Sequence, residues 1–272
     1  MKMNKQRAFL KWAGGKYALS EQINKRLPQG ITLVEPFVGA GSIFLNTDFE
    51  SYILADINPD LIYLYQTVKE NPHRYLEDTF KLFNGEHNNR IQYLQHRARF
   101  NVTEDTYERS VLFLYLNRFG FNGLCRYNKK GIFNVPFGSY KKPYFPEKEI
   151  LAFAEKAKRA HFYCEDFRST FKRATKGCVV YCDPPYVGLS KTADFTAYSK
   201  GGFDAESQAE LAQLSEDTAR IKGIPVLLSN HSTHLTKRLY KGADMTEIKV
   251  SRNISRDGSS RKKVIEILAL YS

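Results

Sequence analysis

The apolar run 178–182 stops abruptly at Asp183-Pro184-Pro185-Tyr186, and this transition restricts the possible folds strongly. The run is rich in Val, Tyr and Cys, which favours a buried β-strand. Proline has a fixed φ and no N–H group, so the two prolines end the hydrogen-bond ladder and form a rigid corner. That corner presents a carboxylate, a carbonyl oxygen and a flat ring, which together complement an amino group on a planar ring. The alternative is a strand that ends in a proline-rich turn, with Asp183 as a cap.

Alternating strands and helices surround this corner. We expect strands over residues 31–35, 52–55, 161–164, 178–182, 225–229 and 264–270, and helices over 147–158 and 205–222. Between the second and third strands, residues 61–116 show helical periodicity without a convincing strand. This order predicts an α/β fold, in which a parallel or mixed sheet has helices on both faces and carries an inserted helical segment. A chain of 272 residues has room for such an insertion.

The first predicted strand ends in the glycine turn Glu35-Pro36-Phe37-Val38-Gly39-Ala40-Gly41-Ser42. Glycines let the backbone approach a ligand closely, and ligands bind at the carboxyl ends of strands in such sheets. The dinucleotide pattern is incomplete, because Phe44 stands where its third glycine would be. Asp56, at the end of the next strand, could accept hydrogen bonds from both hydroxyls of a ribose. A structural turn and a helix-capping aspartate are the alternative for either feature alone.

Positive charge is concentrated in two stretches. The formal net charge is +12 and the isoelectric point is near 9.4, which points to a polyanionic partner, nucleic acid before membrane. Residues 119–146 contain five basic side chains, many aromatic ones and no acidic one. Residues 249–263 contain six basic side chains and one acidic one. This clustering favours nucleic acid over the alternative, a solvated basic surface without a partner.

Composition excludes several other classes. Hydrophobic residues make up 42% of the chain, as in ordinary globular proteins. The longest apolar stretches are too short to cross a bilayer and no signal-peptide core follows Met1, so we expect a cytoplasmic protein without a membrane partner. The four cysteines form no Cys-x-x-Cys pair, and the six histidines show no metal-ligand spacing beyond His231 and His234. We therefore expect no metal site.

Several motifs of the chain resemble those of a known family. The glycine turn, Asp56 and the 183–186 corner are similar to the motifs of amino-group DNA methyltransferases that use S-adenosylmethionine, and residues 9–16 resemble the N-terminal motif of the subgroup with a recognition domain inserted before the corner. The strings 112–118, 122–128, 134–138 and 140–145 closely resemble Dam-type DNA adenine N6-methyltransferases of enteric bacteria. The resemblance covers nearly the whole chain. It implies a Rossmann-like catalytic domain (1–56 and 145–272) and a mainly helical target-recognition domain with a β-hairpin loop (57–144).

The resemblance also implies a reaction, which is methylation of N6 of adenine in the double-stranded DNA sequence GATC. The carboxylate of Asp183 and the carbonyl of Pro184 would accept hydrogen bonds from the adenine amino group, and Tyr186 would stack on the base. The amino group is inaccessible inside a duplex, so the base must be flipped out. We expect the segment 192–198 to act as a lid over it.

Further residues receive roles from the same resemblance. The methyl donor would be bound by Trp12, Lys16 (near its carboxylate), Phe37, Gly39, Asp56 (at its ribose), Asp166, Phe167 and Asp183, with no metal. Trp12 and Phe167 could instead be core aromatics.

DNA would be read mainly by the basic aromatic stretch. Arg126 would contact a guanine edge, Leu124 and Pro136 a thymine methyl group, Lys11 and Tyr140 the outer base pair, Phe121 or Asn122 the vacated stack, and Asn128, Lys141 and Lys142 the phosphates. Taken singly, each could be a solvated surface group. Ser139 departs from the family pattern, since close relatives are expected to have arginine there.

Three alternatives to this function remain open. The first is an adenine methyltransferase of a phage or a restriction–modification system, with the same chemistry. The second is an RNA or protein-glutamine methyltransferase, although such enzymes usually begin the motif with Asn. The third is a DNA-binding protein without catalysis, which Asp183 and Asp56 argue against. We expect a monomer on DNA, associated with a bacterial nucleoid, with roles in mismatch repair, replication or gene regulation.

Overall fold

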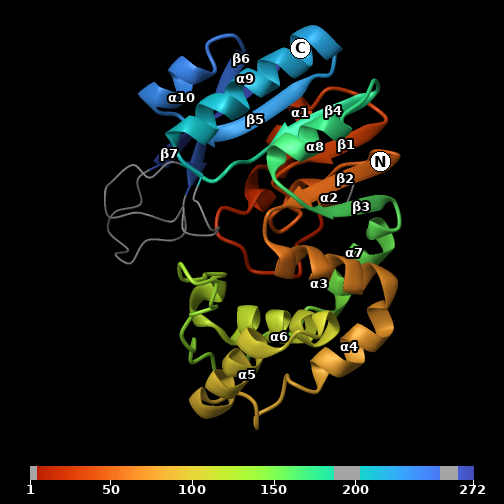
Figure 1. Ribbon diagram of the computed structural model, residues 1–272, viewed down its shortest axis with the longest axis vertical. Coiled ribbons are helices and arrows are strands. Elements are labelled where there is room, and N and C mark those ends of the chain that lie inside the picture. Colours follow the sequence, from red (N-terminus) through yellow and green to blue (C-terminus); the bar gives the residue numbers. More distant parts are fainter. Residues whose placement is uncertain (1–4, 187–202, 252–262) are drawn as a thin grey trace.

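The sheet has seven strands in a computed structural model that describes residues 5–186, 203–251 and 263–272 (Figure 1). Their order across the sheet is β3 (Ala160–Cys164), β2 (Ser51–Asp56), β1 (Thr32–Glu35), β4 (Cys178–Cys182), β5 (Val226–His231), β7 (Lys263–Tyr271) and β6 (Asp244–Ser251). The first five are parallel, and β7 runs antiparallel to both β5 and β6. The prediction of a mixed α/β sheet is therefore confirmed.

Strand order changes direction between β1 and β4, which pair in parallel with Val34 opposite Val180. From β1 the chain proceeds outward through β2 and β3, whereas β4 and β5 extend the other way. Open α/β sheets bind ligands at such a switch point, outside the carboxyl ends of the strands. The glycine turn leaves β1 and the 183–186 corner leaves β4, so both lie at this point.

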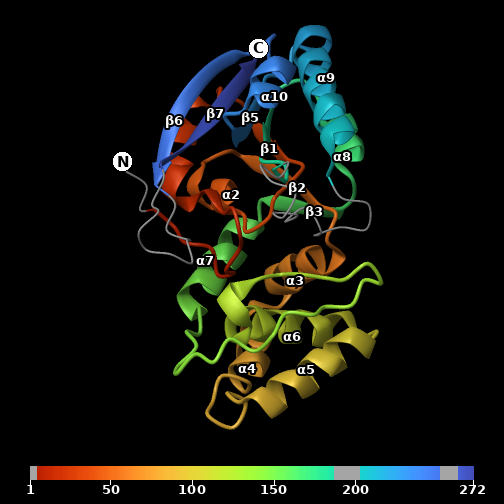
Figure 2. The same ribbon diagram turned by 90° about the vertical axis from the view of Figure 1, so that its left-hand side faces the viewer.

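Helices cover both faces of the sheet (Figure 2). The structure contains η1 (Lys16–Leu19), α1 (Ser20–Arg26), α2 (Ser42–Asn46), α7 (Glu147–Ala157), α8 (Phe167–Arg173), α9 (Ala205–Lys222) and α10 (His234–Leu239). Side chains alternate between two cores, as the strand period of two requires: Val34 and Val180 pack with α8 and α9, whereas Leu33 and Val179 pack with α1, α2 and α7.

The helical insertion follows β2 and lies below the sheet in Figure 1. It contains α3 (Pro59–Glu70), α4 (Pro72–Phe80), α5 (Arg90–Val102) and α6 (Thr106–Phe119), followed by η2 (Phe121–Gly123). Proline occupies the first turn of α3, where its missing N–H group costs nothing, and the Asn58 side chain caps that turn. Helical periodicity in this region therefore predicted the right kind of structure.

The chain from α6 to α7 folds back as a hairpin-like loop. Two isolated antiparallel bridges hold it, Gly120 with Phe137 and Tyr127 with Phe133, rather than a continuous ladder. We call residues 120–146 the reading loop.

One hydrophobic core runs from the sheet into the insertion. It includes Leu33 on β1, Tyr65 on α3 and Phe133 in the reading loop. Tyr65 and Phe9 both contact Phe153 on α7, with ring centroids 4.6 and 5.0 Å away. Among the described residues, the insertion is thus packed as an extension of one sheet face and has no separate core.

One described strand was not expected from the sequence. β6 is an edge strand whose described side chains are mostly exposed, so it lacks the apolar alternation that marks a strand, and it is held by pairing with β7. The proposed lid at 192–198 and most of the basic stretch 249–263 lie outside the described residues. Among those that are described, no helix is long and apolar enough to span a membrane.

Candidate active site

Asp183 follows β4 and is held in place by two partners. The ammonium group of Lys16 lies 2.8 Å from its Oδ1, and the hydroxyl of Ser229 on β5 donates to the same oxygen at 3.1 Å. The Tyr181 hydroxyl contacts Ser229 in turn at 2.9 Å. Because Tyr181 and Asp183 are two residues apart, both point to the sheet face on which η1 lies.

Lys16 connects the N-terminal motif to the 183–186 corner. Its side chain is 5% exposed, and its ammonium group donates to the Tyr186 hydroxyl as well as pairing with Asp183. The Glu266 carboxylate on β7 is 3.8 Å away. The Tyr186 ring in turn lies against His231, with centroids 3.9 Å apart. The sequence predicted that Lys16 binds the methyl donor and that Tyr186 stacks on the target base. In the structure the two side chains are in contact.

A buried polar network supports the corner from behind. The side-chain amide of Gln208 on α9 donates to the carbonyl of Pro185 at 3.0 Å. Asn230 and Tyr240 both hydrogen-bond the Gln208 carbonyl oxygen, at 3.1 Å each. Within the described ranges, by contrast, no hydrogen bond reaches the carbonyl of Pro184. The network thus fixes the corner from the side of α9 and β5.

Sequence reasoning did not identify Ser229, Gln208 or Asn230. Two of them stand at the end of β5, adjacent to β4, and this position was the available signal. Gln208 was detectable only as a polar residue on the buried face of a helix.

The glycine turn brings Gly39 between Trp12 and Asp56. The N–H of Gly39 donates to Asp56 Oδ2 at 3.1 Å, and the N–H of Asn58 donates to Asp56 Oδ1 at 3.0 Å. Gly39 has φ +46°, and a Cβ added there would lie 3.0 Å from Trp12 Nε1, so a side chain at this position would strain the turn and displace the indole. Burial raises the pKa of Asp56 to about 6. Trp12, Gly39 and Asp56, three of the residues predicted to bind the methyl donor, therefore lie together here.

Phe37, Phe167 and Phe203 form an aromatic cluster beside this turn. Phe37 and Phe167 are stacked with centroids 5.6 Å apart, and Phe203 contacts both edge-on. Phe167 is 3% exposed, so packing is a large part of its role. Asp166 caps α8 and accepts hydrogen bonds from the Arg168 guanidinium at 3.0 Å.

Glu35 is a buried carboxyl group that sequence reasoning did not single out as a site residue. It ends β1, is 2% exposed, and its Oε1 has no hydrogen-bond partner among the residues that the structure describes. Burial, together with the nearby charge of Asp183, raises the pKa of Glu35 to about 8. The surroundings of Glu35 thus favour its neutral, protonated form.

The reading loop presents most of the predicted DNA contacts. Phe121 is 48% exposed, and Asn122 beside it is exposed with φ +54°, a conformation that asparagine tolerates better than most residues. Leu124 is partly buried, whereas Pro136, Lys141 and Lys142 are exposed. Ser139 also has a positive φ, +53°.

Several of these side chains already have partners within the protein. The Arg126 guanidinium donates to Asn134 Oδ1 at 2.7 Å and to the Asn134 carbonyl at 3.2 Å. Asn128 Oδ1 accepts two backbone N–H groups of its own turn, so its predicted phosphate contact would use the amide nitrogen. The Lys11 ammonium lies 4.1 Å from the centre of the Tyr140 ring.

Residues 12–254 match the family model of the D12 class N6 adenine-specific DNA methyltransferases. DNA adenine methylase of Vibrio cholerae serotype O1 is 58% identical over 270 residues, covering 99% of this chain and 98% of that protein. DNA adenine methylase of Escherichia coli K12 is 57% identical over 269 residues, and that of Serratia marcescens is 54% identical, covering 99% of this chain in both cases and 96% and 100% of those proteins. A solved structure described as precorrin 8W decarboxylase of Methanobacterium thermoautotrophicum covers 94% of this chain and 89% of that chain, at a TM-score of 0.38 and 10% identity, too low to support an inference.

The family implies S-adenosylmethionine as the methyl donor, and the residues at the switch point fit such a molecule. Gly39 leaves the backbone open to close approach, and Asp56 supplies a partly buried carboxyl group to which hydroxyls can donate. The chain belongs to the D12 class N6 adenine-specific DNA methyltransferases, and it is an enzyme that methylates adenine in DNA.

Proposed function

We propose that the enzyme transfers a methyl group from S-adenosylmethionine to N6 of the adenine in GATC, in double-stranded DNA, after flipping that adenine out of the helix. The observation that carries this proposal is the meeting of the 183–186 corner with the glycine turn and Asp56 at one switch point. An amine acceptor site and a nucleoside site then lie side by side.

The chemistry proposed for the corner uses hydrogen-bond acceptors and no covalent enzyme nucleophile. The lone pair of the adenine amino group is delocalised into the ring, so the group is a poor nucleophile. Asp183 and the Pro184 carbonyl accept its two hydrogens, which favours tetrahedral geometry and stabilises the charge that develops. Tyr186 stacks on the flipped base and holds it in line. The bound donor supplies an electrophilic methyl group on a sulfonium.

We assign the donor to the residues around the glycine turn. Asp56 accepts hydrogen bonds from the ribose, Gly39 allows close approach, and Trp12 lines the same space. Lys16 holds the donor carboxylate, so its ammonium group is shared between that carboxylate and Asp183. The adenine of the donor lies by Phe37, Asp166 and Phe167.

DNA recognition is assigned to Lys11 and the reading loop. Arg126 reads a guanine edge, and Leu124 and Pro136 contact a thymine methyl group. Lys11 and Tyr140 serve the outer base pair; their cation–π contact supports this pairing. Phe121 or Asn122 fills the gap left by the flipped base, because both are exposed at the tip of η2. Asn128, Lys141 and Lys142 contact phosphates.

The division of labour along the chain is part of the proposal. Residues 57–144 choose the target, and residues 1–56 and 145–272 carry out transfer. We propose that the enzyme acts as a monomer on DNA in the bacterial cytoplasm, at the nucleoid. There it would serve mismatch repair, replication or gene regulation.

The proposal is tested on plasmid DNA treated with purified enzyme and S-adenosylmethionine. We expect nucleases that cut only methylated GATC to digest the product, and nucleases that cut only unmethylated GATC to leave it intact. A duplex with scrambled GATC serves as the control. Equal transfer of labelled methyl groups to the scrambled duplex would refute the proposed target.

A further inference from the structure

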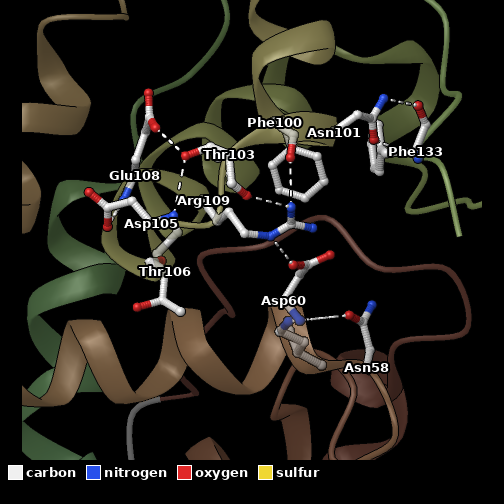
Figure 3. Close-up of polar contacts among 12 residues, drawn as sticks. Asn58, Asp60, Phe100, Asn101, Thr103, Asp105, Thr106, Glu108, Arg109 and Phe133 are labelled. Carbon is white, nitrogen blue, oxygen red and sulfur yellow. Dashed lines mark hydrogen bonds and ion pairs between the residues drawn. The ribbon is translucent and has the colours of Figure 1, made fainter.

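A buried carboxylate joins helices α3 and α6 to the reading loop. Asp60, in the first turn of α3, is 5% exposed. Its Oδ1 accepts a hydrogen bond from Arg109 Nε on α6 at 2.8 Å, shown in Figure 3, and its Oδ2 accepts one from the Tyr127 hydroxyl at 2.5 Å. Burial raises the pKa of Tyr127 well above its usual value, so its hydroxyl remains a donor.

Asn58 links the same place to Asp56. Its backbone N–H donates to Asp56 Oδ1 at 3.0 Å, and its side-chain oxygen accepts from the N–H of Asp60 at 3.0 Å. Its side-chain nitrogen lies 3.6 Å from the Cys125 sulfur. Cys125 and Tyr127 flank Arg126 in the chain, so both neighbours of Arg126 are tied to the four residues that follow Asp56. We call Asn58, Asp60, Cys125 and Tyr127 the junction.

The opposite side of the reading loop is attached to a different element. Asn101 on α5 hydrogen-bonds both the N–H and the carbonyl of Phe133, at 2.9 and 3.0 Å (Figure 3). The Tyr93 hydroxyl and the Arg97 guanidinium, also on α5, donate to the carbonyl of Val135. These attachments do not involve the segment that follows Asp56. Arg126 therefore lies between two anchors of the loop, one on the segment that follows Asp56 and one on α5.

We propose that the junction couples binding of the methyl donor to the positioning of Arg126, with Asp60 and Tyr127 as positioning residues. The inference rests on the proposed function, in which Asp56 holds the donor ribose and Arg126 reads guanine. A ribose hydrogen-bonded to Asp56 restricts the 56–60 segment, and through the junction it restricts the two neighbours of Arg126. Once the methyl donor has ordered the 56–60 segment and the neighbours of Arg126, DNA does not have to order them again. The two ligands therefore bind cooperatively. The coupling is reciprocal, so DNA also tightens donor binding by the same factor.

The test measures how much a bound donor analogue increases the preference of the intact enzyme for GATC over an altered duplex. The probe is sinefungin, a donor analogue with no transferable methyl group. Equilibrium binding is measured for a GATC duplex and for a duplex in which the guanine pair is replaced, each with and without saturating sinefungin. For the wild type, we expect sinefungin to raise the ratio of the two dissociation constants by about 5-fold or more, within the usual range of allosteric coupling.

Tyr127→Phe removes only the hydroxyl that donates to Asp60, and its ring can still pack on Phe133, whose centroid is 5.5 Å away. We expect this variant to discriminate equally with and without sinefungin. Tyr93→Phe is the matched control, because it also removes one hydroxyl that anchors the loop, while Arg97 continues to satisfy the Val135 carbonyl. This control should keep the wild-type response to sinefungin, even if its DNA affinity falls.

The outcomes separate the inference from the proposed function. A full sinefungin response in Tyr127→Phe would overturn the coupling, as would a wild type that methylates GATC selectively but shows no response. Equal loss of the response in Tyr93→Phe would also overturn it, because any loosening of the loop would then suffice. A wild type that does not discriminate even with sinefungin bound would instead refute the assignment of Arg126.

Discussion

Asp183 lies where two demands meet, since its carboxylate balances a buried ammonium group and also faces the site assigned to the amine. The 2.8 Å contact with Lys16 orients it, and Ser229 on the neighbouring strand fixes the same oxygen. Both of these contacts involve Oδ1, and in the proposed function Oδ2 would accept the substrate N–H group.

Asp183→Asn should lower the single-turnover rate of methyl transfer by at least ~10²-fold, the usual effect of losing a group that stabilises transition-state charge. The amide keeps the shape but removes the charge and places N–H groups near the amine. DNA binding should persist, because the reading loop is not altered. Gel-shift and rapid-quench measurements on one preparation would check both. Loss of DNA binding together with transfer would mean that Asp183 is structural.

The proposed role of Asp56 predicts that binding of the methyl donor depends on pH. Its pKa is raised to about 6, so the carboxylate predominates above pH 6 and takes up a proton as the pH falls through that value. A protonated carboxyl group accepts hydrogen bonds from hydroxyls poorly. Sinefungin affinity should therefore fall between pH 7 and pH 5, by up to ~10-fold at one unit below the pKa.

Calorimetric titration across this range measures the effect, with Asp56→Asn as the control. That variant should bind more weakly at every pH and show no change around pH 6. A wild-type affinity that stays constant from pH 7 to pH 5 would exclude Asp56 as an ionised acceptor.

At the scale of elements, the reading loop owes its shape to the helices beside it. Asn101 on α5 and Asp60 on α3 hold its two sides. Two isolated bridges and the hydrogen bonds of Arg126 with Asn134 join those sides to each other, without a continuous ladder. A loop suspended in this way can present Arg126 at a defined place without forming a full β-ladder.

Arg126→Ala should relax discrimination at one base pair by ~1–3 kcal/mol and leave other positions unchanged. Lys141→Ala is the contrasting variant, because a phosphate contact should weaken binding to all sequences alike and reduce the salt slope by about one. Competition binding with singly substituted duplexes distinguishes the two. A uniform loss for Arg126→Ala would reassign that residue to a phosphate.

The sequence predicted elements well where an element has its own pattern. The strand before Asp183 and the helix 205–222 were predicted with the observed bounds, and the alternation of strands and helices led to the correct fold class. β6 was missed because an exposed polar edge strand is defined by its partner, β7. Hairpin pairing in the reading loop likewise depends on α3 and α5, which lie elsewhere in the chain.

The site was predictable only in part, for a related reason. Strand ends are visible in a sequence, so Asp56 and Asp183 could be identified. Contacts between distant segments are not visible, and the ion pair of Lys16 with Asp183 spans 167 positions in the chain. The hydrogen bond of Gln208 to the Pro185 carbonyl forms only when the complete fold brings α9 to the corner. The raised pKa of Glu35 likewise results from burial by the complete fold.

For the whole molecule, the continuous core predicts a single unfolding transition. A separable insertion would have its own core, whereas Tyr65, Phe153 and Phe133 here belong to one cluster that includes the sheet. Trp12, the only tryptophan, reports on the glycine turn, and far-UV circular dichroism is dominated by helices. The two signals should change at the same urea concentration. Two resolved transitions would show that the insertion folds independently.

The position of the junction has a consequence for protein engineering. Helices α3 to α6 follow Asp56 in the chain, and the reading loop returns to contact the first turn of α3 through the hydrogen bond of Tyr127 with Asp60. A specificity segment grafted from another methyltransferase would bring its own loop but would meet a foreign 56–60 segment. Exchange points placed before residue 56 would transfer the two together. Chimaeras joined at residue 60 should still bind DNA, but sinefungin should no longer increase their discrimination between the GATC duplex and the altered duplex.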